Sequence, residues 1–383
     1  MYADGDRKRK CEKRFRFFLH RGGIWSIINQ LRGSKDPEVY GEGYSMKLAV
    51  DVMGGDNAPR AVLDGVLAFL NEKEAEGVDL KLFGDEKVLN AFSTAHPEIK
   101  DRIETFFTTE TIEMGEHPTE AIRRKKDSSL VKALECVRDH DADCIISAGS
   151  TGAVLTGATL IVRRHKGIKR PALATFMPTV TGGVTEVLDV GANTDCKPGY
   201  LVQFAMMGKA YIEAVMSVKN PRIGLLNNGA EEEKGNALTK EAHQRLKAID
   251  GINFIGNVEA RELMSGEVDV LVCDGFDGNV LLKTTEGVAK GIGAMLKQVL
   301  MESTRGKIAG LIGKNAFANL KKKLDYTEYG GAPLLGINGG VIKAHGSSDA
   351  KSIKNCMLQG VRYVRGGVNE TIGALAETLN IED

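Results

Sequence analysis

The chain is 383 residues long, and its 51 basic side chains balance 51 acidic ones, which argues against a general nucleic-acid-binding protein because such a protein needs a positive field. Apolar residues make up 42% of the chain and charged residues 27%, which excludes an intrinsically disordered or fibrous protein. Glycine is in excess, with 45 residues where this length usually holds ~27, but no three-residue period is present, so collagen is excluded.

The first 45 residues differ from the rest in charge. They hold 10 Lys and Arg against 6 Asp and Glu, whereas residues 46–383 hold 41 against 45. Arg16, His20 and Arg21 interrupt the apolar run, so the segment is not a secretory signal peptide. We predict a disordered basic extension over residues 1–45; the alternative is a basic, aromatic arm that rests on anionic lipid.

From Met46 onward, short apolar runs alternate with helical stretches, which predicts one α/β domain over residues 46–383. Strands are predicted at 47–52, 79–84, 144–149, 172–177, 184–190, 222–227, 252–256 and 268–274. Helices are predicted at 58–72, 119–139, 152–166, 198–218, 235–248 and 280–302. Most strand runs lack strict alternation, as expected of strands covered on both faces. The fold class is therefore a three-layer, doubly wound, mostly parallel sheet, with a β-hairpin at the Gly-Gly turn between 172 and 190.

Glycines recur just past the predicted strand ends, together with Ser, Thr, Asn and Asp. Because the carboxyl ends of parallel strands share one edge of a sheet, we expect five such turns at one edge. Backbone N–H groups exposed by glycine turns suit phosphate. The residues that we predict to bind substrate there are Asp51, Gly54, Gly55, Asp56, Ser150, Thr151, Gly152, Asn228, Asp274 and Gly275.

Several standard chemistries have no motif in the chain. There is no Walker loop, no complete GxGxxG after a strand, no GxSxG and no HExxH. The six cysteines show no zinc-ligand spacing and suit reduced, buried thiols in a cytosolic protein. No uninterrupted apolar stretch reaches the length of a transmembrane helix. An anion-binding enzyme without a metal, a cofactor or a covalent nucleophile is what remains.

Seven motifs in order carry a family resemblance over residues 46–366. They are DVMGGDNAP, EAIRRKKDSS, AGSTGA, LDVGAN, LLNNGAEEEKGN, CDGFDGNVLLK and YGGAPLLGINGGVIKAHGSSD. Together they resemble the bacterial phosphate acyltransferases of phospholipid synthesis, the acyl-acyl carrier protein:phosphate acyltransferase family. The resemblance implies a fold related to phosphotransacetylase and isocitrate dehydrogenase-like enzymes, a homodimer, and a cytoplasmic enzyme peripherally associated with the membrane.

The implied reaction transfers a fatty acyl chain from acyl carrier protein to inorganic phosphate. The acyl phosphate then feeds a membrane-bound glycerol-3-phosphate acyltransferase. Phosphate is already a nucleophile and a thiolate leaves readily, so the protein needs only to hold phosphate near the thioester carbon and stabilise the oxyanion.

Individual roles in this reaction are predicted from residue type. The Gly54-Gly55 and Ser150–Gly152 turns would cradle phosphate, and Asn193, Asn228 and Asn279 would donate uncharged hydrogen bonds. Lys283 or His345 would neutralise the developing charge or protonate the departing sulfur. The alternatives are a surface lysine and a helix-capping histidine. Asp51, Asp56 and Asp274 would orient these groups, since carboxylate and phosphate repel. Cys196 is a weaker candidate for an acyl-enzyme nucleophile.

Two basic runs are candidates for docking the acidic acyl carrier protein. The first holds Arg123 and Arg124, and the second holds Arg163 and Arg164. Positive patches near a site entrance would steer such a partner. The alternative is an ordinary solvated face, and Arg124 could instead contact phosphate.

The segment 288–325 is helical by period, and we predict that it forms an amphipathic protrusion. Its apolar stripe includes Ile308 and Ile312, with lysines on the other side, and Leu311 departs from the pattern; we predict that Ile308, Leu311 and Ile312 contact the membrane. A basic amphipathic helix fits peripheral contact with anionic membrane. A helical arm that packs in a dimer is the alternative, and both roles are compatible.

Three other functions compete with the leading prediction. The first is a phosphotransacetylase-like enzyme that uses an acyl-coenzyme A. A dehydrogenase is weaker, because its glycine fingerprint is not assembled. A non-catalytic membrane scaffold would explain 288–325 but not the glycine turns.

Overall fold

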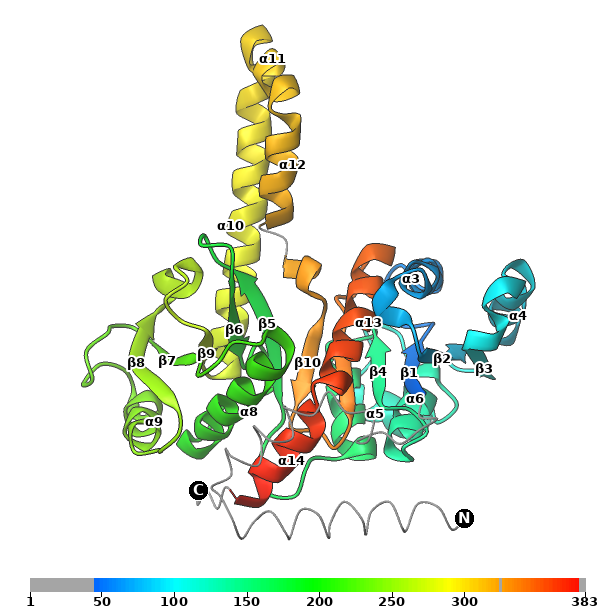
Figure 1. The fold of residues 1–383 in the computed structure, drawn as a ribbon, viewed down its shortest axis with the longest axis horizontal. Coiled ribbons are helices and arrows are strands. Elements are labelled where there is room, and N and C mark those ends of the chain that lie inside the picture. Colours follow the sequence, from blue (N-terminus) through cyan, green and yellow to red (C-terminus); the bar gives the residue numbers. More distant parts are fainter. Residues whose placement is uncertain (1–44, 324–325, 379–383) are drawn as a thin grey trace. The chain divides into compact units, whose positions relative to one another are not determined.

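The computed structural model describes residues 45–323 and 326–378, so the predicted basic extension lies outside the described residues except for Ser45. Its centre is a sheet whose described strands follow the order β3-β2-β1-β4-β11-β10-β5-β6-β9-β7-β8 (Figure 1). The strands are β1 (Met46–Asp51), β2 (Val78–Gly84), β3 (Ile103–Phe107), β4 (Cys144–Ser147), β5 (Ala172–Pro178), β6 (Val184–Leu188), β7 (Arg222–Asn227), β8 (Asn253–Glu259), β9 (Val270–Val272), β10 (Ala332–Leu335) and β11 (Gly340–Lys343).

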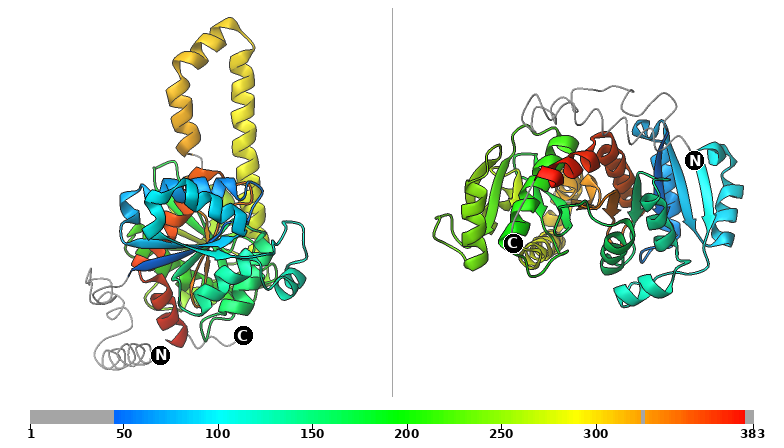
Figure 2. Two further views of the ribbon diagram at one scale, coloured as in Figure 1. Left: turned by 90° about the vertical axis from the view of Figure 1, so that its right-hand side faces the viewer. Right: turned by 90° about the horizontal axis from the view of Figure 1, so that it is seen from below.

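Helices cover both faces of this sheet (Figure 2). They are α3 (Arg60–Leu70), α4 (Glu86–Ala95), α5 (Pro118–Arg124), α6 (Ser129–Arg138), α7 (Thr151–Gly157), α8 (Pro198–Met216), α9 (Ala237–Lys247), α10 (Gly275–Met301), α11 (Thr304–Ile312), α12 (Lys314–Lys323), α13 (Ala350–Arg365) and α14 (Val368–Thr378). A further turn, Ala158–Val162, continues α7 as a π-helix.

Side-chain alternation along the central strands shows the three layers. Ala49 and Ile145 pack into one core cluster with buried residues of α6 and α7. Their neighbours Leu48 and Ile146 face the opposite layer, where a Cβ placed on Gly360 of α13 would lie 3.7 and 3.5 Å from them. Because both faces are buried, the strands carry continuous apolar runs. The predicted three-layer, mostly parallel α/β fold is confirmed.

The direction of the strands changes in the middle of the sheet. β11 is parallel to β4, but β10 is antiparallel to both β11 and β5, and β6 is antiparallel to β5. β6, β9, β7 and β8 are parallel to one another and therefore run opposite to β1 and β4. The prediction that five glycine turns share one edge is thus wrong. The strands before these turns run in two opposite directions, so no single set of parallel strands places all five; residues after β4, β6 and β9 nevertheless line one cavity.

The predicted hairpin is confirmed, since β5 and β6 pair in antiparallel register from Ala174–Leu188 to Pro178–Val184. The helix predicted over 119–139 is two helices, α5 and α6. The break has a local cause, because the Ser128 hydroxyl accepts from the Val131 N–H and begins α6 anew. The strands β3, β10 and β11 and the helices α4, α13 and α14 were not predicted.

Helices α10 to α12 extend away from the sheet as an arm (Figures 1 and 2). α10 has 27 residues and is about 40 Å long at the usual rise per residue. Only Gly275 and Gly278 at its start are buried. Apolar side chains are exposed along the arm, among them Val288, Ile292, Met295, Val299, Ile308, Leu311 and Ile312. Among the described residues, no helix combines the length and hydropathy that a membrane span requires.

Candidate active site

A cavity of about 460 Å³ lies where the two halves of the sheet meet. The start of α7, strand β5, the segment after β6 and helix α10 form one part of its wall. The segment before β10, the end of β11 and the start of α13 form the rest. Polar and titratable residues of the wall include Thr151, Asn279, Lys283, Glu286, Lys343, His345 and Cys356.

Lys343 is the buried cation of the cavity. It is the last residue of β11 and only 6% exposed. Its Nζ donates a hydrogen bond to the Ala344 carbonyl, which neutralises none of its charge. Burial lowers the pKa of Lys343 to about 8, although nearby Cys356 and the carboxylates of Asp51 and Asp56 favour the ammonium. Burial disfavours the charged form of Lys343, and an anion bound in the cavity would stabilise that form.

His345 lies two residues further on and is more exposed. Its Nδ1 is 2.8 Å from the Ser347 hydroxyl oxygen. Burial, and then the positive charge of Lys283, lowers the pKa of His345 below its ordinary value. The imidazole is therefore neutral at neutral pH and offers a hydrogen bond rather than a charge.

Helix α10 brings three polar side chains into the cavity wall. Asn279, Lys283 and Glu286 follow one another at helical spacing on one face. Lys283 Nζ lies 3.1 Å from Glu286 Oε2, and the lysine side chain is 53% exposed while the glutamate side chain is 8% exposed. The half-exposed ammonium lies at the opening of the cavity, and its carboxylate partner lies inside.

Asp51 ties the turns after β1 and β4 together beside the cavity. Its two carboxylate oxygens accept hydrogen bonds from the hydroxyls of Ser129 and Ser147, both at 2.6 Å. Burial raises the pKa of Asp51, and these hydrogen bonds oppose that shift. A Cβ on Gly54 would lie 2.3 Å from Asp51 Oδ2, so a side chain at position 54 would collide with this carboxylate. Asp51 therefore supports the wall.

The other half of the wall is built around Asp189, which is fully buried. Its Oδ1 accepts from the backbone N–H groups of Leu173, Gly191 and Ala192 at 3.0–3.1 Å. Its Oδ2 accepts from the backbone and side-chain nitrogens of Asn193 at 2.7 and 2.9 Å. Burial raises the pKa of Asp189, and the hydrogen bonds from Ala192 and Asn193 oppose the shift. One carboxylate thus shapes the segment from β6 to Asn193.

Asp274 fixes the start of α10 through hydrogen bonds from two backbone N–H groups. It caps the helix by accepting from the Phe276 N–H, and its second oxygen accepts from the Cys196 N–H, both at 2.8 Å. Burial and the neighbouring Asp274 raise the pKa of the Cys196 thiol. Cys196 is therefore a poor candidate nucleophile.

The structure brings part of the predicted site together. Thr151, Gly152, Asn279, Lys283 and His345 line the cavity. A second group adjoins the lining residues without itself lining the cavity: Asp51, Gly54, Gly55, Asp56, Ser150, Asn193, Asp274 and Gly275. In this group the Asp56 N–H donates to the Gly346 carbonyl at 2.8 Å, next to His345. Asn228 follows β7, outside the cavity wall, and its N–H donates to the Asn227 side chain.

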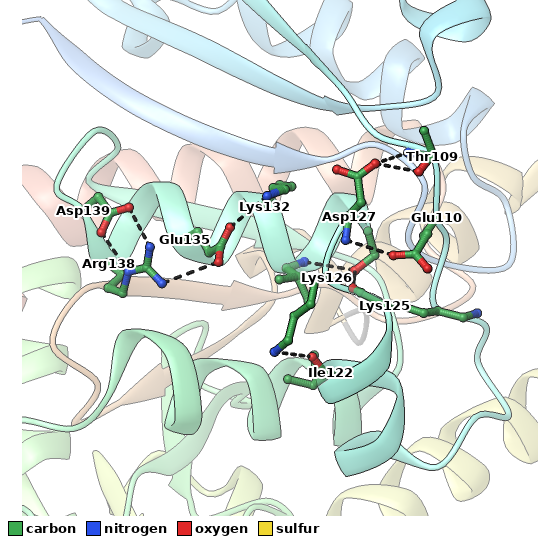
Figure 3. Close-up of polar contacts among 12 residues, drawn as sticks. Thr109, Glu110, Ile122, Lys125, Lys126, Asp127, Lys132, Glu135, Arg138 and Asp139 are labelled. Carbon is green, nitrogen blue, oxygen red and sulfur yellow. Dashed lines mark hydrogen bonds and ion pairs between the residues drawn. The ribbon is translucent and has the colours of Figure 1, made fainter.

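The first predicted docking run, residues 123–126, divides into two arginines and two lysines, and Figure 3 shows the contact of Lys126 with Ile122. Lys125 Nζ donates to the Thr111 carbonyl at 2.6 Å, and Lys126 Nζ donates to the Ile122 carbonyl at 3.1 Å. Arg123 and Arg124 in the last turn of α5 are exposed, and Arg124 makes only a long contact of 3.7 Å with Glu120. Two of the four cations are thus held by the fold, and the two arginines face solvent.

The second run is placed differently. Arg163 and Arg164 follow the π-helical turn, at the end remote from the cavity. The Arg164 guanidinium donates to the carbonyls of Ile168 and Lys169. Arg163 is exposed.

Lys343, Glu286 and Cys356 in the cavity were not predicted as site residues. Lys343 stands two residues before His345 in a motif that the family resemblance had used. Glu286 follows Lys283 by three residues, a spacing at which helical side chains meet. Both signals were present in the sequence, but neither separates a cavity residue from a surface one.

Comparisons with known proteins give the family. A family model described as "Fatty acid synthesis protein" matches residues 46–371. A phosphate acyltransferase of Clostridioides difficile is 47% identical over 338 residues, which are 88% of this chain and 98% of that protein. A phosphate acyltransferase of Clostridium novyi is 50% identical over 327 residues, which are 85% of this chain and 97% of that protein.

Solved structures give the same fold at low sequence identity. A phosphotransacetylase from Streptococcus pyogenes has a TM-score of 0.57 at 16% identity and covers 89% of this chain and 98% of its own. A branched-chain phosphotransacylase from Enterococcus faecalis has a TM-score of 0.51 at 13% identity and covers 83% of this chain and 99% of its own. The sequence matches to named relatives, together with this fold, identify the chain as a member of the phosphate acyltransferase family, acyltransferases of fatty acid and phospholipid synthesis.

Proposed function

We propose that this protein transfers a fatty acyl chain from acyl-acyl carrier protein to inorganic phosphate and releases an acyl phosphate. The product would supply a membrane-bound glycerol-3-phosphate acyltransferase in phosphatidic acid synthesis. The observation that carries the proposal is Lys343, a buried ammonium in a cavity that also receives Lys283 and His345. Within the described part of the chain Lys343 has no ion pair, and a buried cation of this kind suits a small anionic substrate.

The reaction is a direct displacement at the thioester carbon. A phosphate oxygen attacks the carbonyl carbon, and the tetrahedral intermediate then expels the thiolate, so a C–O bond forms and the C–S bond breaks. Lys343 holds the phosphate deep in the cavity. Lys283, half-exposed at the opening, binds another oxygen of the same phosphate and neutralises the charge that develops during transfer.

Uncharged donors complete the site. His345, Asn279 and Thr151 line the cavity; the neutral imidazole of His345 and the amide of Asn279 would donate to the oxyanion of the intermediate, and Thr151 would contact the phosphate. The glycine turns at 54–55 and 150–152 shape the wall around these donors. Asp51, Asp189 and Asp274 position the segments that carry them.

The test is a single reaction mixture. Purified protein, long-chain acyl-acyl carrier protein and phosphate are incubated with hydroxylamine, which traps acyl phosphate as the hydroxamate. We expect hydroxamate above the background of direct thioester cleavage only when both the protein and phosphate are present. No hydroxamate above background would overturn the proposal, and faster transfer from long-chain acyl-coenzyme A would assign the donor to coenzyme A instead.

Docking of the carrier is proposed at Arg123 and Arg124. Helix α5 lies against α7 at the cavity, since a Cβ on Gly152 would lie 2.6 Å from Pro118. Arg123→Glu/Arg124→Glu is expected to lower kcat/KM for acyl-acyl carrier protein ~10- to 100-fold, because it reverses the charge that steers an acidic partner. A short-chain acyl thioester without the carrier should react at the wild-type rate. An equal loss with both donors would contradict docking.

The arm is proposed to serve both a homodimer and the membrane. Val288, Ile292, Met295 and Val299 form one exposed stripe on α10, suited to a helix of a second copy. Leu311 and Ile312 on α11 are 75% and 82% exposed and suit contact with anionic lipid.

Two matched double variants separate these roles. Leu311→Glu/Ile312→Glu is expected to reduce co-sedimentation with anionic vesicles ~10-fold or more, with the dimer and the hydroxamate assay unchanged. Ile292→Glu/Met295→Glu is expected to shift the protein to monomer in sedimentation velocity, because it buries like charges in the seam. Unchanged vesicle binding in the first variant would contradict the membrane role.

A further inference from the structure

The cavity that suits phosphate also contains a carboxylate. Its charged side chains are Lys283, Lys343 and Glu286, so one negative group lies among the positive ones. A buried carboxylate repels an anion and accepts hydrogen bonds without donating any. A carboxylate in the wall would weaken the binding of a fully ionised oxyanion, because it repels the negative charge and has no proton to donate.

The two oxygens of Glu286 have different surroundings. Oε2 forms an ion pair with Lys283 Nζ at 3.1 Å. Oε1 is buried and has no hydrogen-bond partner among the residues that the structure describes. The side chain is 8% exposed, whereas Glu135, which pairs with Lys132 at the same spacing on α6, is 30% exposed and makes a second ion pair with Arg138. An enclosed acceptor left unpaired is costly, so Glu286 needs a donor when the site is filled.

The donor can be a hydroxyl group of the bound anion itself. An oxyanion bonded to Lys283 Nζ at the usual ~2.8 Å lies within ~6 Å of Glu286 Oε2, since the lysine nitrogen is 3.1 Å from that oxygen. Another oxygen of the same anion can therefore reach the carboxylate. Contact is favourable only when that oxygen carries a proton.

We propose that Glu286 makes the cavity selective for an oxyanion that carries a proton, by accepting a hydrogen bond from its hydroxyl. Inorganic phosphate has at least one P–OH group near neutral pH, and so has arsenate. Sulfate has none, and neither has the dianion of a phosphate monoester. The inference rests on the proposed phosphate site and specifies its substrate class: free, protonated phosphate rather than any tetrahedral anion.

The experiment measures competition for labelled phosphate by equilibrium dialysis near neutral pH. The wild-type protein should bind phosphate, lose it to arsenate, and retain it against a ~100-fold excess of sulfate, since a site built around a ligand hydroxyl rejects analogues without one. Glu286→Gln should still bind phosphate, because its amide oxygen can accept from P–OH. Its amide N–H can donate to sulfate, so sulfate should now compete within ~10-fold of phosphate.

Glu135→Gln is the matched control, because it removes a carboxylate of the same helical spacing outside the cavity. It should keep wild-type discrimination. Sulfate competing equally in the wild type, or being rejected equally by Glu286→Gln, would overturn the inference and leave the proposed function intact. Failure of the wild type to bind phosphate at all would overturn the proposed function, and the inference with it.

Discussion

Lys343→Met is expected to lower kcat/KM for phosphate by ~10²- to 10³-fold, the usual loss when one preorganised charged group is removed from a transition-state site. The effect is large because Lys343 is the cavity's buried ammonium, while Lys283 is half-exposed and already paired with Glu286. Steady-state assays at varied phosphate concentration measure it. Activity within ~2-fold of wild type would remove Lys343 from the mechanism.

Stability separates loss of function from loss of fold in this variant. Methionine has a similar length and no charge, and burial of an ammonium is costly, so the melting temperature should be unchanged or higher. Lys343→Arg keeps the charge but not the shape and should recover part of the phosphate affinity. A fall in melting temperature for Lys343→Met would mean that the ammonium is structural.

The same side chain predicts a pH dependence with a definite sign. The pKa of Lys343 in the folded protein is about 8, below its ordinary value. Phosphate affinity of the free enzyme should therefore fall as pH rises through about 8. Between that pH and the ordinary lysine pKa the unfolded chain binds more protons, so the contribution of Lys343 to stability becomes more favourable with rising pH there. Both trends should be absent in Lys343→Met.

Asp189→Ala is expected to lower the free energy of unfolding by about 4 kcal/mol, because several buried donors lose their acceptor at once. Those donors are the backbone N–H groups at 173 and 191–193 and the side-chain amide of Asn193. Urea denaturation measures the change. Activity should also fall, since Val190 and Gly191 line the cavity.

An exposed aspartate gives the control. Asp349 caps α13 and accepts from the N–H and hydroxyl of Ser352 at 2.9 and 2.7 Å. Asp349→Ala should cost only about 1 kcal/mol, the usual value of a helix cap. If Asp189→Ala and Asp349→Ala lower the free energy of unfolding by the same amount, the hydrogen bonds to the buried Asp189 carboxylate contribute less to stability than their number implies.

Those parts of the fold that have a local sequence pattern could be predicted. Buried apolar strands such as β1 and β7, and the Gly-Gly turn of the β5–β6 hairpin, have signatures in the sequence. β10 and β11 are four residues each and lie between glycine turns, so no run marks them. They are also the strands through which the sheet changes direction, and for that reason the single-edge prediction failed.

The site could be predicted only in outline. Motif glycines marked the turns, but they serve different contacts: Gly54 lets Asp51 approach, whereas Gly152 lies against Pro118 and lines the cavity. Lys343 occupies a strand position that alternation alone cannot distinguish from a surface lysine. Its burial depends on β10 and β4, which flank β11, and β4 comes from a part of the sequence about 200 residues earlier.

The placement of β10 and β11 also bears on synthesis of the chain. β11 pairs with β4, about 200 residues earlier, and β10 pairs with β5. A nascent chain that has not yet produced residue 332 therefore holds two half-sheets with open edges at β4 and β5, which favour aggregation until the last strands insert. The inserting strand also delivers Lys343, so a prematurely terminated chain has no anion site, and binding competence is acquired at the end of translation.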